Sequence, residues 1–285
     1  MAWKKQSPDI YKNYSKPKLV IFGLLFFKKI AMKLHTNIIG EGKPFIILHG
    51  FLGMGDNWKT LGKMFSEKGY EVHLVDQRNH GKSPHSDDFT YEVLVEDLKE
   101  YIETHNLDEI VLMGHSMGGK TAMLFATTYP DLLKKLIIVD IAPKYYKPHH
   151  QDILAGLSLL EESNVSSRQE AAKIISEYVP DKPTQLFLLK NLDREGKDKY
   201  VLKVNLKIFK EKIDNIGAAL DDDKTYDGET LFIKGEKSNY IKLPEDEKLL
   251  QTHFPGAEIE VISNAGHWVH AENQKDFYDA VIRFL

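Results

Sequence analysis

No cysteine occurs among the 285 residues of the chain. Disulfide bonds and thiolate metal sites are therefore excluded, and the absence fits a reducing compartment, so we expect a cytoplasmic protein. Long apolar runs are also missing: residues 19–27 (LVIFGLLFF) form a run of nine, whereas a membrane-spanning helix needs about 20. Internal repeats and low-complexity tracts are absent. The composition, 42% hydrophobic and 28% charged, is typical of a soluble globular protein.

Acidic residues outnumber basic ones beyond the N-terminal end of the chain. Residues 1–33 hold eight lysines and one aspartate, which leaves 30 basic and 41 acidic residues in the remainder, a net charge of about −11. Phosphate contacts need a basic surface. A body this acidic therefore argues against a nucleic-acid partner.

The lysine-rich extension at residues 1–31 is open to three interpretations. We favour a translation start at Met32, which would leave the extension outside the native protein. The second interpretation is a weak membrane-surface anchor through residues 19–27. A secretion signal ranks last, because Lys28 and Lys29 follow the apolar run directly and no small-residue cleavage site is visible.

From Met32 onward, short apolar runs alternate with amphipathic stretches. The apolar runs predict buried parallel strands at residues 45–49, 71–75, 109–113, 135–139, 230–234 and 258–262. A run of mixed polarity at residues 33–39 suits the edge of a sheet. The amphipathic stretches predict helices at residues 57–67, 91–104, 117–128, 244–253 and 274–284. This alternation indicates an α/β fold with a mostly parallel, doubly wound sheet.

One long interval breaks the alternation. Residues 141–226 contain no convincing strand. They predict helical segments at residues 151–162, 167–178, 184–192 and 200–219. We therefore expect a helical cap at residues 141–226, inserted between two strands of a core formed by residues 32–140 and 227–285.

The pentapeptide at residues 114–118, Gly-His-Ser-Met-Gly, lies between a predicted strand and a predicted helix. A serine in the middle of G-x-S-x-G in that context indicates a nucleophile elbow, with Ser116 as the nucleophile. The glycines permit a turn in which flanking side chains would collide. Backbone N–H groups at the start of the following helix can stabilise an oxyanion.

Residues 114–121 also fit G-x-x-x-x-G-K-[ST], the phosphate-binding P-loop, and Asp140 ends an apolar strand as a magnesium ligand would. Three observations argue against nucleotide binding. Residues 115–117 are bulky where the backbone must wrap a phosphate. Two buried strands, at residues 45–49 and 71–75, precede the strand that leads into the motif, whereas a P-loop usually follows the first strand. The reading also leaves His267 and the cap unexplained.

Acyl transfer by serine needs a base, and His267 is the candidate. It lies in a glycine-containing loop between the last predicted strand and the last helix. His270 is the alternative, but we expect it at the start of that helix, in a helix or surface contact. A metal site of His267, His270 and Glu272 is disfavoured because no second ligand cluster accompanies them.

The expected oxyanion donors are the backbone N–H groups of Phe51 and Met117. Phe51 belongs to a His-Gly-Phe-Leu-Gly loop at residues 49–53, after a strand, and Met117 follows the nucleophile. In a second loop, residues 76–83 (DQRNHGKS), the arginine and aspartate are expected to hold the loop against neighbouring segments and not to take part in catalysis. Within it, His80 is a possible pocket residue but not the base.

The acid that orients the histidine is harder to assign. The loop after the strand at residues 230–234 is the usual place, but Ser238 stands where an aspartate is expected, and Glu236 comes too early. Asp140, at the carboxyl end of a neighbouring strand, lies on the same rim as Ser116. We favour Asp140 over Glu236, with Ser238 as a hydrogen-bonding support.

From Met32 to its end the chain resembles the α/β-hydrolases. The matching marks are H-G-F-L-G, D-x-R-x-H-G-x-S, G-H-S-M-G-G and G-H-W-V-H-A-E. Within that superfamily the chain is most similar to the YbfF-type small esterases. The resemblance implies an acid after the sixth strand, matching Asp140, and a serine near the usual acid position, matching Ser238. It also implies hydrolysis of small esters and acyl-CoA thioesters.

These observations predict a serine ester hydrolase with a Ser116, His267 and Asp140 triad. Water completes the reaction, so we expect no cofactor and no metal, and a small-molecule ester or thioester as the only partner. Residues 19–27 are the only segment through which the sequence would allow membrane association, and no oligomeric state is predicted. Two other classes stay open: another reaction on the same scaffold, such as carbon–carbon bond hydrolysis or perhydrolysis, and a ligand receptor with very slow turnover.

Overall fold

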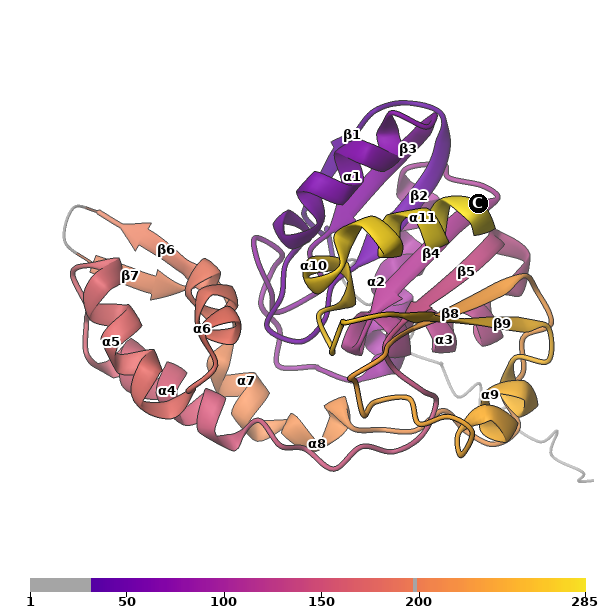
Figure 1. Ribbon diagram of the computed structural model, residues 1–285. Helices are drawn as coiled ribbons and strands as arrows, with labels where there is room; N and C mark the ends of the chain where they lie inside the picture. Colours follow the sequence, from indigo (N-terminus) through magenta and orange to yellow (C-terminus); the bar gives the residue numbers. More distant parts are fainter. Residues whose placement is uncertain (1–31, 197–198) are drawn as a thin grey trace, which may run out of the picture. The chain divides into compact units, whose positions relative to one another are not determined.

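The computed structural model describes residues 32–196 and 199–285, and its centre is a seven-stranded sheet (Figure 1). The strands are β1 (Thr36–Ile39), β2 (Lys43–Leu48), β3 (Tyr70–Val75), β4 (Ile110–His115), β5 (Leu133–Val139), β8 (Thr230–Gly235) and β9 (Ala257–Ile262). They lie in the order β1-β3-β2-β4-β5-β8-β9. β1 is antiparallel to β3, and the other neighbouring pairs are parallel. The predicted mostly parallel sheet, with residues 33–39 at its edge, is confirmed.

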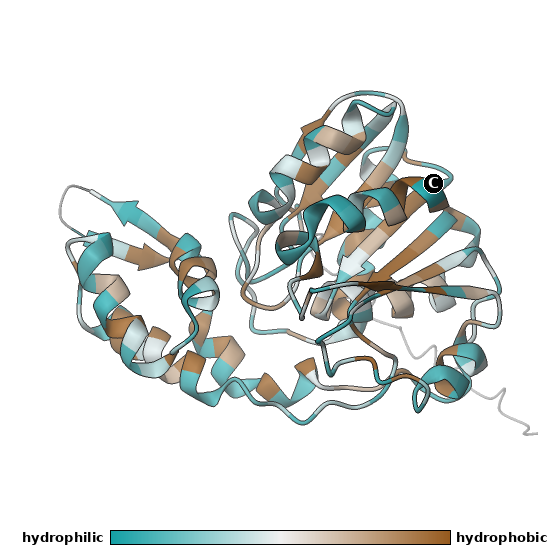
Figure 2. Ribbon diagram, viewed as in Figure 1, coloured by the Kyte–Doolittle hydropathy of each residue, from teal (hydrophilic) through white to brown (hydrophobic). Residues whose placement is uncertain are grey.

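Each face of the sheet carries its own apolar cluster. The flanking helices are α1 (Lys59–Ser66), α2 (Tyr91–Thr104), α3 (Met117–Thr128), α9 (Glu247–His253), α10 (Val269–Glu272) and α11 (Gln274–Phe284). On β2, Ile46 packs in a cluster with residues of α2 and α3, whereas its neighbour Phe45 packs in one with residues of α1 and α11. Figure 2 shows hydrophobic residues along the strands and polar residues on the flanking helices. The sheet is therefore doubly wound, as alternating side-chain direction along buried strands requires.

The cap segment, residues 141–226, is inserted between β5 and β8 (Figure 1). Its elements are α4 (Gln151–Glu162), α5 (Arg168–Tyr178), α6 (Lys182–Leu188), the 3-10 turn η3 (Leu189–Asn191), β6 (Leu192–Glu195), β7 (Lys199–Leu202), α7 (Leu206–Glu211) and α8 (Ile213–Ile216). A third apolar cluster joins its leucines and isoleucines to core residues that include Phe51 and Met117. The interior of the cap segment is thus continuous with the loops around the elbow.

Two strands lie in the cap segment, where the sequence predicts none. β6 lies between the helices expected at residues 184–192 and 200–219 and overlaps the first only at Leu192, whereas β7 replaces the start of the second. The two strands pair antiparallel, and Gly196 with a φ of +69° follows β6. Only Leu192 of the eight strand residues is fully buried. Neither short strand alternates apolar and polar residues, which is why the expectation of a strand-free cap was wrong.

The two connections between the cap segment and the sheet are hydrogen-bonded to each other. The Tyr146 N–H donates to the Gly217 carbonyl at 2.9 Å, and the Leu220 N–H donates to the Pro143 carbonyl at 2.9 Å. The chain that enters the cap segment therefore runs beside the chain that leaves it.

The extension at residues 1–31, with its apolar run at residues 19–27, lies outside the described residues. None of the helices in the described ranges is both long enough and apolar enough to span a bilayer.

Candidate active site

Ser116 occupies a sharp turn between β4 and α3. Its φ of +53° and ψ of −116° lie outside the regions that residues with a side chain usually adopt. The flanking glycines make the turn possible: a Cβ on Gly114 would lie 2.2 Å from the Gly118 carbonyl oxygen, and one on Gly118 would lie 2.5 Å from the Leu48 carbonyl oxygen. The sequence thus folds here as the strained strand-to-helix elbow that its glycine spacing predicts.

His267 follows β9 in a loop and faces Asp140. Its Nδ1 lies 2.8 Å from Asp140 Oδ2. The imidazole stacks on the Tyr240 ring, with centroids 3.9 Å apart and planes 17° from parallel. His115 Nε2 donates to the His267 carbonyl at 2.9 Å and so fixes the backbone of this loop. With Nδ1 directed at a carboxylate, Nε2 is the ring nitrogen left to act as a base.

Asp140 lies at the end of β5 and is fully buried. Its Oδ1 accepts a hydrogen bond from the Gly235 N–H at 3.1 Å, and its Oδ2 accepts one from the Ser238 hydroxyl. Glu236 points elsewhere: its Oε2 accepts the Asn264 N–H at 2.8 Å on the exposed side of the loop. The structure therefore brings Asp140 and Ser238 to His267 and leaves Glu236 away from it.

The loop that holds Phe51 passes directly beside the elbow. A Cβ on Gly50 would lie 3.3 Å from Ser116 Cβ and 2.9 Å from His115 Nδ1, so only glycine fits there. Phe51 and Met117 both line the pocket that Ser116 and His267 line. Both residues expected to donate to an oxyanion are thus beside the predicted nucleophile.

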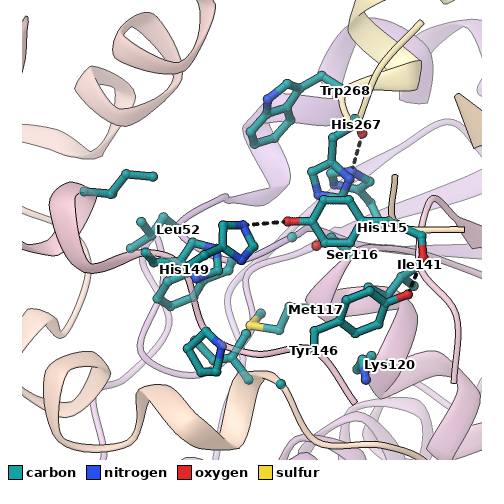
Figure 3. Close-up of a pocket in the computed structure, with 18 of the residues that line it drawn as sticks. Leu52, His115, Ser116, Met117, Lys120, Ile141, Tyr146, His149, His267 and Trp268 are labelled. Carbon is teal, nitrogen blue, oxygen red and sulfur yellow. Dashed lines mark hydrogen bonds between the residues drawn. The ribbon is translucent and has the colours of Figure 1, made fainter. Parts of the chain in front are cut away.

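The pocket is a cavity of about 220 Å³ between the core and the cap segment. Figure 3 shows Ser116, Met117, His267 and Trp268 on its walls. Leu188 and Phe187 of α6 line it from the cap segment. No aspartate or glutamate is among the lining residues that the structure describes. Its wall is mostly apolar, which suits a hydrocarbon group.

Several histidines near the site are held in the neutral form. Burial, with a contribution from His149 and His267, lowers the pKa of His150 to about 4. Burial also lowers the pKa of His270 to about 3 and that of His115 well below its ordinary value. His270 lies in α10, just before the last helix, where it is buried and stacks on Trp58 with ring centroids 4.0 Å apart. It also contacts Phe277 of α11, so of the two contacts expected for it the helix contact is present and the surface contact is not.

Lys120 has a role that the sequence interpretation missed. Its Nζ donates to the Lys144 carbonyl at 2.6 Å and also to the Ala218 carbonyl, and it lies 4.9 Å from the centre of the Tyr146 ring. Burial, with the charge of Lys144, lowers its pKa to about 7. Lys120 lines the pocket but is committed to backbone carbonyls, an arrangement unlike that of a phosphate-binding lysine.

Sequence reasoning also missed Tyr240. Burial raises the pKa of Tyr240 to about 12, and the nearby carboxylate of Asp140 adds to this effect. The tyrosine therefore presents a neutral ring to His267. No local pattern indicates this role, because Tyr240 lies in an irregular loop after β8 and its position depends on the packing of three separate segments.

A sequence model of the α/β-hydrolase fold matches residues 43–274. The chain belongs to the α/β-hydrolase family. It is 38% identical over 247 residues to the sn-1-specific diacylglycerol lipase ABHD11 of Mus musculus, an alignment that covers 84% of this chain and 80% of that one. It is 32% identical over 257 residues to esterase YbfF of Escherichia coli strain K12, covering 90% and 96%. A solved structure titled marine microorganism esterase matches with a TM-score of 0.86 and 40% identity, covering 90% of this chain and all of that one.

These relatives confirm the predicted α/β-hydrolase family and the predicted class of enzyme, a carboxylic ester hydrolase. The roles of individual side chains stay predictions that the geometry above supports.

Proposed function

We propose that this α/β-hydrolase is a serine esterase with a Ser116, His267 and Asp140 triad, acting on esters and thioesters of small or medium acyl groups. One observation carries the proposal: His267 Nδ1 lies 2.8 Å from a fully buried carboxylate oxygen of Asp140, on the rim where Ser116 occupies its strained turn. A base oriented by a buried acid beside an elbow serine is the arrangement that acyl transfer needs.

In the first half of the reaction, Ser116 Oγ attacks the carbonyl carbon of the substrate. His267 Nε2 takes the hydroxyl proton, and Asp140 stabilises the imidazolium that forms. The negative charge that develops on the carbonyl oxygen is stabilised by the N–H groups of Phe51 and Met117. The imidazolium then returns its proton to the leaving alcohol or thiol, and the acyl group stays on Ser116.

In the second half, water attacks the acyl-enzyme. His267 again takes a proton, this time from water, and gives it to Ser116 as the carboxylic acid leaves. The same groups therefore serve both halves, and a thioester differs only in its leaving group. The mouse relative is named a diacylglycerol lipase, which supports including acylglycerols among the esters to be tested.

The pocket supports an apolar acyl group of limited size. Apolar side chains such as Ile153, Phe187 and Leu188 face the 220 Å³ cavity, and no carboxylate lines it in the described part of the chain. Burial of hydrocarbon contributes roughly 0.8 kcal/mol per methylene, so affinity should rise with chain length until the cavity is full. A panel of p-nitrophenyl esters and acyl-CoAs of increasing chain length measures that limit.

The direct test is Ser116→Ala. It should lower turnover of a p-nitrophenyl ester by about 10⁶-fold and abolish labelling by a fluorophosphonate. Thr121→Ser, in the next turn of α3, is the matched control: it should fold and keep the turnover of wild type. Activity that persists in Ser116→Ala overturns the mechanism. A burst of product without steady-state turnover in the wild type would instead identify a slow receptor.

A further inference from the structure

Leu52, the residue after Phe51, has a left-handed backbone with a φ of +59°. A leucine rarely adopts this conformation, so surrounding contacts must maintain it. Both of its backbone polar groups are bound by side chains. The Leu52 N–H donates to His80 Nε2 at 3.2 Å, and the Leu52 carbonyl accepts from Asn191 Nδ2 at 2.8 Å.

His80 supplies the anchor on the core side. Its Nδ1 lies 2.9 Å from the Arg78 carbonyl, which fixes the proton on Nδ1 and leaves Nε2 as an acceptor. Burial, reinforced by the neighbouring His49, lowers the pKa of His80 well below its ordinary value. The neutral ring can therefore accept the Leu52 N–H at any pH near neutrality.

Asn191 supplies the anchor on the cap side, from the turn η3. That turn is held inside the cap segment: Arg168 donates to the Leu189 carbonyl at 2.9 Å and to the Leu192 carbonyl at 3.1 Å. The Asn191 carbonyl accepts the Lys203 N–H at 2.8 Å. The side chain of Asn191 thus projects from a rigid part of the cap segment.

The amide of Asn191 is badly suited to a purely structural role. Asn191 is fully buried, and its Oδ1 has no hydrogen-bond partner among the described residues. A buried amide that leaves a polar atom unsatisfied costs free energy, so an apolar side chain of similar size would pack there at least as well. What the amide contributes, and an apolar side chain could not, is the hydrogen bond to the Leu52 carbonyl.

The cap segment and the oxyanion loop also share apolar contacts. Phe51, Leu52 and Met117 belong to one cluster with Leu188 and Leu189 of the cap segment. Docking of the cap segment therefore acts on both expected oxyanion donors and on Leu52, which adjoins the first.

We propose that Asn191 is a positioning residue, which couples docking of the cap segment to the alignment of the Phe51 N–H in the oxyanion hole. The inference rests on the serine esterase function proposed above. Asn191 holds Leu52 in its left-handed conformation from one side while His80 holds it from the other, and Phe51 is the adjoining residue of the loop. A misplaced donor stabilises the transition state poorly without weakening the binding of the ester itself.

The test is Asn191→Leu, which keeps the size of the side chain and removes its hydrogen bond. Loss of a whole oxyanion donor costs about 10²–10³ in kcat, and displacement of one should cost about 10-fold. We expect kcat for a p-nitrophenyl ester to fall by about that factor with KM nearly unchanged. The dissociation constant of phenylboronic acid, whose adduct with serine places an oxygen in the oxyanion hole, should rise by a similar factor.

Asn215→Leu is the matched control. Asn215 also lies in the cap segment and donates to a core carbonyl, that of Phe89, at 2.7 Å. Loss of this hydrogen bond should lower the melting temperature but leave kcat and the affinity for phenylboronic acid close to those of wild type. Equal losses of kcat in the two variants, or wild-type kcat in folded Asn191→Leu, overturn the proposal. If Asn191→Leu does not fold, Asn191→Ala and Asn215→Ala give the same comparison.

The proposal and the esterase function on which it rests fail in different ways. If fluorophosphonate does not label the wild-type protein, the esterase function fails. If it labels wild type and folded Asn191→Leu at the same rate, only the positioning role of Asn191 fails.

Discussion

Ser238 and His267 bind the same oxygen of Asp140. The Ser238 hydroxyl donates to Oδ2, and His267 Nδ1 lies 2.8 Å from that same Oδ2. Oδ1 is occupied separately, by the Gly235 N–H at 3.1 Å. The carboxylate is therefore fixed in rotation by three donors, and the direction in which it presents Oδ2 to the imidazole depends partly on a serine.

Replacement of Ser238 should impair the chemical step. In Ser238→Ala the Oδ2 atom loses one of its two partners, and a hydrogen bond to a charged group contributes about 1.5–3 kcal/mol. We expect kcat to fall roughly 10-fold with KM little changed, measured by steady-state hydrolysis of a p-nitrophenyl ester. Ser238→Thr keeps the hydroxyl and is the control. Equal kcat in the alanine and threonine variants would show that the serine does not orient Asp140.

The assignment of the acid is tested by two single-atom replacements. Asp140→Asn removes the charge that stabilises the imidazolium and should lower kcat by about 10⁴-fold. Glu236→Gln should stay within about 3-fold of wild type, because its carboxylate binds the Asn264 N–H on the exposed side of the loop. Circular dichroism verifies that both variants are folded. A crippled Glu236→Gln beside a nearly normal Asp140→Asn would reverse the assignment.

Burial of His270 makes stability depend on pH. The pKa of His270 falls from 6.5 to about 3 on folding, chiefly because of burial. Between these values the unfolded chain binds the proton and the folded one does not. The free energy of unfolding therefore falls as the pH falls below about 6.5, by about 1.4 kcal/mol per pH unit for this histidine.

Urea unfolding at several pH values measures this slope. His270→Phe keeps an aromatic ring against Trp58 and should lose that part of the slope, whereas His150, whose pKa is lowered to about 4, continues to contribute. A variant whose free energy of unfolding falls with acid as steeply as that of wild type would contradict the prediction.

The candidate site residues could be placed from the sequence where a general rule of chain geometry determines their position. The turn at Ser116 needs glycine at positions 114 and 118, because a Cβ there would collide with backbone carbonyls. The spacing of these two glycines is visible in the sequence. Asp140 follows from a rule about parallel sheets: the carboxyl ends of strands meet on one rim. Family membership and the mostly parallel sheet follow from the same kind of local pattern.

The rest could not be predicted because it depends on contacts between distant segments. Tyr240 reaches His267 only through the packing of the loop after β8. Asn191 reaches Leu52 across 139 positions of chain. The β6–β7 pair was missed for another reason, since β6 is mostly charged and exposed and β7 has no apolar–polar alternation.

The hydrogen bonds of Lys120 connect the cap segment to the elbow helix. Its ammonium group binds the carbonyls of Lys144 and Ala218, one on each connection of the cap segment, from the helix that begins at Met117. The connections are also paired to each other. Swinging the whole cap segment outward would therefore strain contacts at the helix that carries an expected oxyanion donor. Lys120 therefore ties both connections of the cap segment to the helix that follows the predicted nucleophile.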